Sequence, residues 1–205
     1  MIAVLDYGIG NLRSAAKALQ HLGADARLVT DPTEVEHADA VVLPGVGAFG
    51  PCARALRSSG LEDAARAALA AGLPFLGICV GLQLLYEGSE EAPGVPGIGA
   101  IAGMVRALPA TVKRPQMQWN RLRRSPGRPS AMLAGLEESP WVYFVHSFAP
   151  QPSGGGAEEV VATCDYGGEV VAGVEVGPLW GTQFHPEKSG RVGLAMLANF
   201  VQAAR

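Results

Sequence analysis

The sequence predicts an α/β fold, with a doubly wound, mostly parallel sheet and added antiparallel strands. Between residues 2 and 86, short apolar runs alternate four times with stretches of helical spacing, and the links between them are short. This alternation is typical of parallel strands joined by right-handed crossover helices. After residue 86, apolar runs of strand length are separated by turns rich in glycine and proline, which favours antiparallel strands.

The first half of the chain supplies the elements of the expected parallel sheet. Asp31 and Pro32 are residue types that start a helix, and Gly23 is a type that ends one. The expected strands cover residues 2–5, 27–29, 40–43 and the run that leads from Leu73 to Cys79. The expected helices cover residues 12–22, one long alanine-rich stretch at 53–71, and the segment that begins at Val80.

The second half supplies the expected antiparallel additions. Gly167 and Gly168 separate two apolar runs and predict a hairpin. Strands are expected within residues 101–112 and at 141–148, 160–163, 170–176 and 179–184, and a closing helix at 192–204.

Composition excludes several classes of protein. A chain of 205 residues with net charge −3 has no positive field to attract nucleic acid or an acidic membrane. Cys52, Cys79 and Cys164 are odd in number and far apart, which fits neither a disulfide framework nor a zinc site, so we expect no metal. Reduced thiols, an N-terminus without a basic region, and no apolar run of about 18 residues predict a cytoplasmic protein without a targeting or membrane-spanning segment.

Cys79 lies between Gly77 and Gly81, where an apolar strand run meets a helical run. Gly-x-nucleophile-x-Gly is typical of the sharp strand-to-helix turn that exposes one reactive side chain above a sheet. Glycine tolerates the strained backbone of such a turn, and the helix N-terminus favours a thiolate. The alternative is a buried structural cysteine, so the partner residues decide between the two.

His185 and Glu187 are the expected partners of this thiol. Pro186 biases His185 to an extended backbone, where residues two apart share a face. The carboxylate can therefore bind one ring nitrogen and leave the other for the nucleophile, an arrangement that activates a cysteine. His146 is the rival base, but it has no carboxylate near it in the sequence.

Acyl transfer at a thiol also needs N–H donors for an oxyanion. The N–H of Val80, the residue after the nucleophile, is one expected donor. The second is expected from Val46 or Gly47, in a glycine-rich loop that leaves the neighbouring strand at the same edge of the sheet. The alternative for this loop is a plain tight turn.

The motif Gly-Ile-Cys-Val-Gly-Leu-Gln at residues 77–83, followed by His-Pro-Glu at 185–187, resembles the triad-type (class I) glutamine amidotransferases. Three further stretches resemble the glutaminase subunits of imidazole glycerol phosphate synthase, from histidine biosynthesis. They are Asp-Tyr-Gly-Ile-Gly-Asn-Leu at 6–12, Pro-Gly-Val-Gly-Ala-Phe at 44–49 and Tyr-Phe-Val-His-Ser-Phe at 143–148. The resemblance covers essentially the whole chain and implies one glutamine amidotransferase domain over residues 1–205, with a flavodoxin-like fold.

The resemblance also implies a mechanism. Cys79 attacks the side-chain amide carbon of glutamine, His185 takes the thiol proton and gives it to departing ammonia, and Glu187 orients His185. The thioester is then hydrolysed to glutamate, with no cofactor. The residues implied to contact glutamine are Gly47, Gln83, His146 and Ser147.

The implied partner is a (β/α)₈-barrel cyclase, in a heterodimer with this chain. It takes the ammonia by a sequestered path to form imidazole glycerol phosphate and an aminoimidazole carboxamide ribotide. The positions that match partner-facing residues are Asn11, Trp119, Tyr143 and Lys188. One segment of that region departs from the family pattern Pro-His-Met-Gly-Trp-Asn, because residues 115–120 here carry Gln116 and Gln118.

Three rival functions stay open on the sequence alone. The first is a glutaminase of another pathway, such as anthranilate or aminodeoxychorismate synthase, which lacks the Asp-Tyr-Gly-x-Gly-Asn opening. The second is a thiol hydrolase or peptidase that acts alone, and the third is a non-catalytic binding module on the same fold.

Overall fold

The computed structural model describes the backbone of residues 1–205 and the side chains of residues 1–154 and 158–205. Its central sheet has the strand order β2-β1-β3-β4-β13-β12-β11-β8. The strands are β2 (Ala26–Val29), β1 (Ile2–Leu5), β3 (Ala40–Gly45), β4 (Phe75–Cys79), β13 (Leu179–Thr182), β12 (Glu169–Val176), β11 (Val160–Asp165) and β8 (Arg123–Arg124). Pairing is parallel from β2 to β13 and antiparallel from β13 to β8, which confirms the predicted α/β class.

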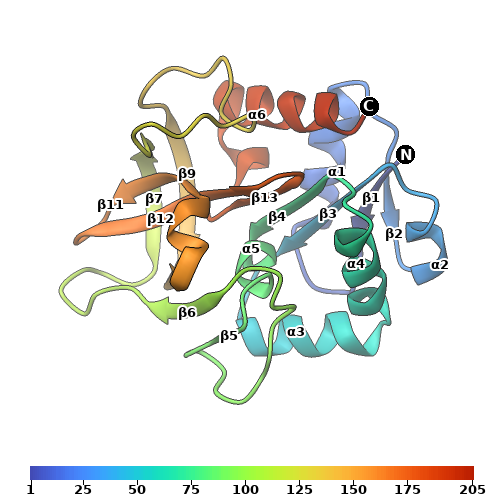
Figure 1. Cartoon of the computed structure of the whole chain (residues 1–205), viewed down its shortest axis with the longest axis horizontal. Coiled ribbons are helices and arrows are strands. Elements are labelled where there is room, and N and C mark those ends of the chain that lie inside the picture. The colour runs from blue at the N-terminus through green and yellow to red at the C-terminus, as the bar shows by residue number, and fades with distance from the viewer.

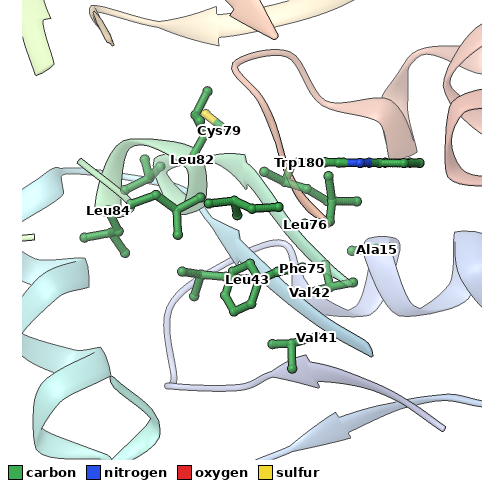
Figure 2. Packing of buried hydrophobic residues seen from close by; sticks show 14 of the residues in the cluster. Ala15, Val41, Val42, Leu43, Phe75, Leu76, Cys79, Leu82, Leu84 and Trp180 are labelled. Carbon is green, nitrogen blue, oxygen red and sulfur yellow. The ribbon is translucent and has the colours of Figure 1, made fainter. Parts of the chain in front are cut away.

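Helices cover both faces of this sheet (Figure 1). On one face lie α1 (Leu12–His21) and α6 (Gly190–Ala203), and on the other α3 (Phe49–Ser58), α4 (Leu61–Ala70) and α5 (Val80–Leu84). The short α2 (Pro32–Val35) packs beside α4 and begins as predicted, since the Asp31 side chain accepts from the Thr33 N–H at 2.9 Å. Buried strand residues such as Leu43, Phe75 and Leu76 pack in the core shown in Figure 2, together with Leu82 and Leu84 of α5.

The prediction of one long helix over residues 53–71 is wrong. The helical segment begins earlier, at Phe49, and is broken at Gly60, which has a φ of +77° and separates α3 from α4. A left-handed residue ends a helix because the next turn cannot continue in register. The alanine-rich composition favours one continuous helix, and Gly60 is the one residue in the sequence that indicates the break.

The prediction that the later strands are antiparallel additions is wrong for β13. The chain reverses at Gly177 (φ +57°) after β12, so β13 runs antiparallel to β12 and parallel to β4. Thr182 is therefore paired with Ile78 at the carboxyl edge of the sheet. This register brings the segment after β13 beside the turn after β4.

Two smaller sheets flank the central one. One has the order β10 (Phe148–Pro152), β6 (Gly103–Ala107) and β5 (Gly88–Ser89), and the other pairs β7 (Gln116–Arg121) with β9 (Trp141–His146). The predicted strand 141–148 is thus divided between two sheets, and β7 was not predicted. Two segments form short 3₁₀ helices, η1 (Gly154–Glu159) and η2 (Pro186–Lys188). None of the described helices is long and apolar enough to cross a membrane.

Candidate active site

Cys79 occupies a strained turn between β4 and α5. Its φ of 55° and ψ of −109° make it the only non-glycine residue with positive φ among those described. A Cβ at Gly77 would lie 2.9 Å from the Leu82 backbone, and one at Gly81 would lie 1.8 Å from the Leu43 carbonyl oxygen. Neither position has room for a side chain, so both require glycine for steric reasons. Figure 2 shows Cys79 at the edge of the buried cluster to which it belongs.

His185 and Glu187 follow β13 and form the predicted pair, with His185 Nδ1 2.9 Å from Glu187 Oε1. Their side chains are 1% and 2% exposed. A carboxylate accepts, so Nδ1 carries the hydrogen and Nε2 is left without a hydrogen-bond partner in the protein. Burial alone would lower the pKa of His185, but its interactions with Cys79 and Glu187 outweigh burial and raise it to about 9.

The backbone around His185 is tied to strand β9. The His185 N–H donates to the Tyr143 carbonyl at 3.0 Å, and the Ser189 hydroxyl donates to the His185 carbonyl at 2.6 Å. The same hydroxyl accepts from the Tyr143 N–H at 3.0 Å. The ring is therefore held in place by its own turn and by the strand that carries Tyr143.

The sulfur of Cys79 has two polar neighbours besides His185. Gln183 Nε2 lies 3.7 Å from Sγ, and the Val145 carbonyl oxygen lies 3.8 Å from Sγ. Gln83 Nε2 in turn contacts Gln183 Oε1 at 3.1 Å and the Phe148 carbonyl at 2.9 Å. Sequence reasoning named Gln83 but missed Gln183, although Gln183 is two residues before His185, the spacing already used for Glu187.

The loop after β3 approaches the elbow closely. A Cβ at Gly45 would lie 2.8 Å from the Gly81 nitrogen and 2.9 Å from Val80 Cβ. The Val46 carbonyl accepts from the Cys52 thiol at 3.3 Å. Since the C=O and N–H of a trans peptide point in opposite directions, the Gly47 N–H points away from Cys52. The loop therefore lies directly against the turn that carries Cys79.

A small cavity of about 240 Å³ opens at the elbow. It is smaller than the roughly 300–1,000 Å³ typical of sites for drug-sized ligands, and so suits a small metabolite. It is lined by Val46, Gly47, Cys79, Val80, Gln83, Glu91, Pro115, Val145, His146, Ser147 and Phe148. All the residues that we expected to bind substrate or oxyanion line this cavity, whereas His185 and Glu187 are not part of its lining.

Two polar side chains in the lining have hydrogen-bond partners on the backbone. His146 Nδ1 donates to the Phe148 carbonyl at 2.9 Å, which leaves Nε2 as a buried acceptor without a partner. Burial lowers the pKa of His146 to about 4, so the ring is neutral at pH 7. Glu91 accepts from the Phe49 N–H at 2.8 Å at the start of α3. Sequence reasoning missed Glu91, which lies in a polar loop without a motif.

The expected partner-facing residues lie outside the cavity. Trp119 on β7 is 47% exposed and meets Tyr143 of β9 edge-on, with the ring centroids 5.9 Å apart. Lys188 is exposed, and Asn11 Nδ2 lies 3.5 Å from Glu187 Oε1, so Asn11 also contacts the His185–Glu187 pair.

Only one of the two departures from the family pattern lies on the surface. Gln118 is exposed, whereas Gln116 is fully buried and donates to the Cys164 sulfur at 3.9 Å. Gln116 therefore acts inside the protein and does not contribute to an exposed face.

Comparisons with known proteins agree with this geometry. The family model for class-I glutamine amidotransferases matches residues 3–204. The imidazole glycerol phosphate synthase subunit HisH of Methanothermobacter thermautotrophicus is 48% identical over the full length of both chains. The HisH subunit of Moorella thermoacetica is 45% identical, covering 100% of this chain and 95% of its own. A solved glutamine amidotransferase structure shares the fold with a TM-score of 0.77 at 24% identity, covering 99% of this chain and 98% of its own. The chain therefore belongs to the class-I glutamine amidotransferase family, among the HisH subunits of imidazole glycerol phosphate synthase.

Proposed function

We propose that this chain is the glutaminase subunit of a cytoplasmic imidazole glycerol phosphate synthase. It hydrolyses L-glutamine to glutamate and ammonia, and it passes the ammonia to a (β/α)₈-barrel cyclase in a heterodimer. The cyclase then forms imidazole glycerol phosphate and aminoimidazole carboxamide ribotide. The observation that carries the proposal is that Cys79 and the His185–Glu187 pair follow two paired parallel strands at the same edge of the sheet, with Cys79 lining a small cavity there.

The first half-reaction forms a thioester. His185 Nε2 takes the thiol proton, and the Cys79 sulfur attacks the side-chain amide carbon of glutamine. The N–H of Val80 and a donor from Val46 or Gly47 receive the negative charge on the amide oxygen. When the carbon–nitrogen bond breaks, His185 returns its proton to the nitrogen, which leaves as ammonia.

The second half-reaction restores the enzyme. His185 takes a proton from water, the hydroxyl attacks the thioester carbon, and the carbon–sulfur bond breaks. Glutamate leaves, the electron pair of the broken bond stays on the Cys79 sulfur, and His185 gives this sulfur the proton that it took from water. Glu187 accepts from Nδ1 at 2.9 Å throughout, which fixes the ring orientation and supports the charged imidazolium in both halves.

The cavity also offers groups that suit an amino acid. Glu91 supplies a carboxylate for the α-ammonium group, and the free Nε2 of His146 supplies a hydrogen-bond acceptor. Gln83, Gly47 and Ser147 complete the polar lining. Because burial lowers the pKa of His146 and makes it a weak base, and because it lacks a carboxylate partner, it is better suited to binding than to the base role considered for it from sequence.

The cyclase is proposed to dock on the β7–β9 ribbon. Trp119, Trp141 and Met117 are exposed there, 47%, 47% and 64% respectively, and large exposed side chains of this kind anchor protein interfaces. The Tyr143 backbone on the same ribbon accepts from the His185 N–H and donates to the Ser189 hydroxyl. A partner that binds this ribbon would thus contact a strand that is hydrogen-bonded to the backbone of His185.

The decisive experiment replaces Cys79 with alanine and measures glutamate release in the presence of the cyclase. Activity should fall by at least about 10³-fold with the fold and partner binding intact, while the control Cys164→Ala, which alters another buried thiol, keeps it. Normal turnover by Cys79→Ala would refute the assignment.

We also expect the isolated subunit to be a poor glutaminase. Complementation of a histidine auxotroph should separate this function from glutaminases of other pathways. Hydrolysis of peptides without a partner would favour the solitary hydrolase.

A further inference from the structure

Gln183 is a buried amide beside the reacting sulfur to which the mechanism above gives no role. Its side chain is fully buried and lies between Gln83 and Cys79. Its backbone N–H is already bonded to the Ala172 carbonyl at 2.9 Å, which fixes the residue at the end of β13. A buried side-chain amide needs partners for both its oxygen and its nitrogen, so the partners show which end of the amide faces the sulfur.

The Phe148 carbonyl determines that orientation. A carbonyl oxygen only accepts, so the Gln83 group that faces it at 2.9 Å must be the NH₂ group. The other hydrogen of this NH₂ group meets Gln183 at 3.1 Å, which requires the oxygen of Gln183 there. The Gln183 NH₂ group then has to face the Cys79 sulfur, 3.7 Å away. One backbone carbonyl thus sets the polarity of two successive amides.

The sulfur has contrasting neighbours. The Val145 carbonyl at 3.8 Å can accept from a thiol but cannot donate to a thiolate. The Gln183 amide at 3.7 Å can donate, and hydrogen bonds to a charged group are stronger than those to a neutral one. The two neighbours therefore favour opposite protonation states of the same atom.

We propose that Gln183 is a catalytic residue that donates its Nε2–H to the Cys79 thiolate and is oriented for this by Gln83 and the Phe148 carbonyl. The inference rests on the proposed function and adds a role at two points of the cycle. The donor stabilises the sulfur charge when His185 holds the thiol proton. It does so again when the carbon–sulfur bond of the thioester breaks and the electron pair returns to sulfur.

Alkylation of Cys79 by iodoacetamide tests the proposal without using glutamine. The thiolate sulfur displaces iodide and forms the carbon–sulfur bond, so the rate follows the thiolate fraction. Cys79 modification is followed by peptide mapping between pH 5 and 10. In Gln183→Leu, the pH midpoint of alkylation should rise by about one unit, so that the rate below both midpoints falls about tenfold.

The chain contains a matched control. Gln116 is also fully buried and donates to a cysteine sulfur, that of Cys164, at 3.9 Å. Gln116→Leu removes the same chemical group at a similar cost in burial and should leave the Cys79 midpoint unchanged. Gln183→Glu provides a second probe, because it keeps the shape and an acceptor for Gln83 but lacks the N–H, and it should also raise the midpoint.

The wild-type protein gives an independent measurement. The ¹⁵N-labelled side-chain amide of Gln183 should shift with pH at the alkylation midpoint, and the shift should vanish in Cys79→Ala. The inference would be overturned if folded Gln183 variants kept the wild-type pH midpoint of Cys79 alkylation. It would also be overturned if the chemical shift of the Gln183 amide did not change with pH. If Cys79→Ala still loses glutaminase activity, the proposed function stands despite that failure. Retained activity in Cys79→Ala defeats the proposed function instead.

Discussion

The backbone at position 79 should make glycine more acceptable there than elsewhere in the core. Cys79 has φ 55° and ψ −109°, a region that side chains with a Cβ rarely adopt. Cys79→Ala removes the thiol and keeps this strain, whereas Cys79→Gly removes both. The comparison between the two variants therefore isolates the conformational cost of the turn.

The magnitude follows from three contributions. Relief of a strained backbone is worth about 2 kcal/mol, within a range of about 1–3. Against it stand the extra unfolded-state freedom of glycine, about 0.5–1 kcal/mol, and the loss of one buried methyl group, about 0.8 kcal/mol. Cys79→Gly should therefore be more stable than Cys79→Ala by about 0.2–0.7 kcal/mol.

Cys52 provides the reference position. It is also fully buried, but it lies inside the regular helix α3, where no strain is present to relieve. The step from alanine to glycine there should cost about 1.5–2 kcal/mol, from helix propensity and the lost methyl. The free energies of unfolding in urea of the alanine and glycine variants at positions 79 and 52 give the cost of the alanine-to-glycine change at each position. An equal cost of glycine at positions 79 and 52 would refute the strain argument.

Three further predictions concern the site and the proposed interface. The pKa of His185 is raised from 6.5 to about 9, so the stability it contributes is full below pH 6.5 and is lost as the pH rises through 9. The difference in unfolding free energy between wild type and His185→Gln should shrink over that window, and a constant difference would contradict the ion pair. Glu91→Gln should raise the KM for glutamine about tenfold with a smaller effect on kcat, as steady-state kinetics with the cyclase would reveal; an unchanged KM removes Glu91 from the substrate site. Trp119→Ala should weaken cyclase binding by about 2 kcal/mol in titration calorimetry, while Trp141→Ala compares a second exposed tryptophan of the ribbon; undiminished affinity in both would exclude it as the docking face.

Patterns that depend on neighbouring residues were readable from the sequence. The apolar runs gave β1 and β3, the flanking glycines gave the turn at Cys79, and the two-residue spacing gave the His185–Glu187 pair. The same spacing rule also reaches Gln183, but an uncharged amide offers no chemical reason for attention until its neighbours are known. Glu91 could not be found at all, because its place at the cavity depends on how a polar loop folds back on α3.

The direction of β13 matters more to the chemistry than any local motif. Cys79 follows the carboxyl end of β4, and His185 follows that of β13, because the two strands are parallel with Ile78 opposite Thr182. Were β13 antiparallel to β4, its carboxyl end would lie at the opposite edge of the sheet, a strand length of roughly 13 Å from the sulfur. The hairpin at Gly177 reverses the chain once between β12 and β13 and so restores the direction that the triad requires. Each antiparallel strand beyond β13 is thus an extension of the sheet, whereas β13 is part of the machinery that assembles the site.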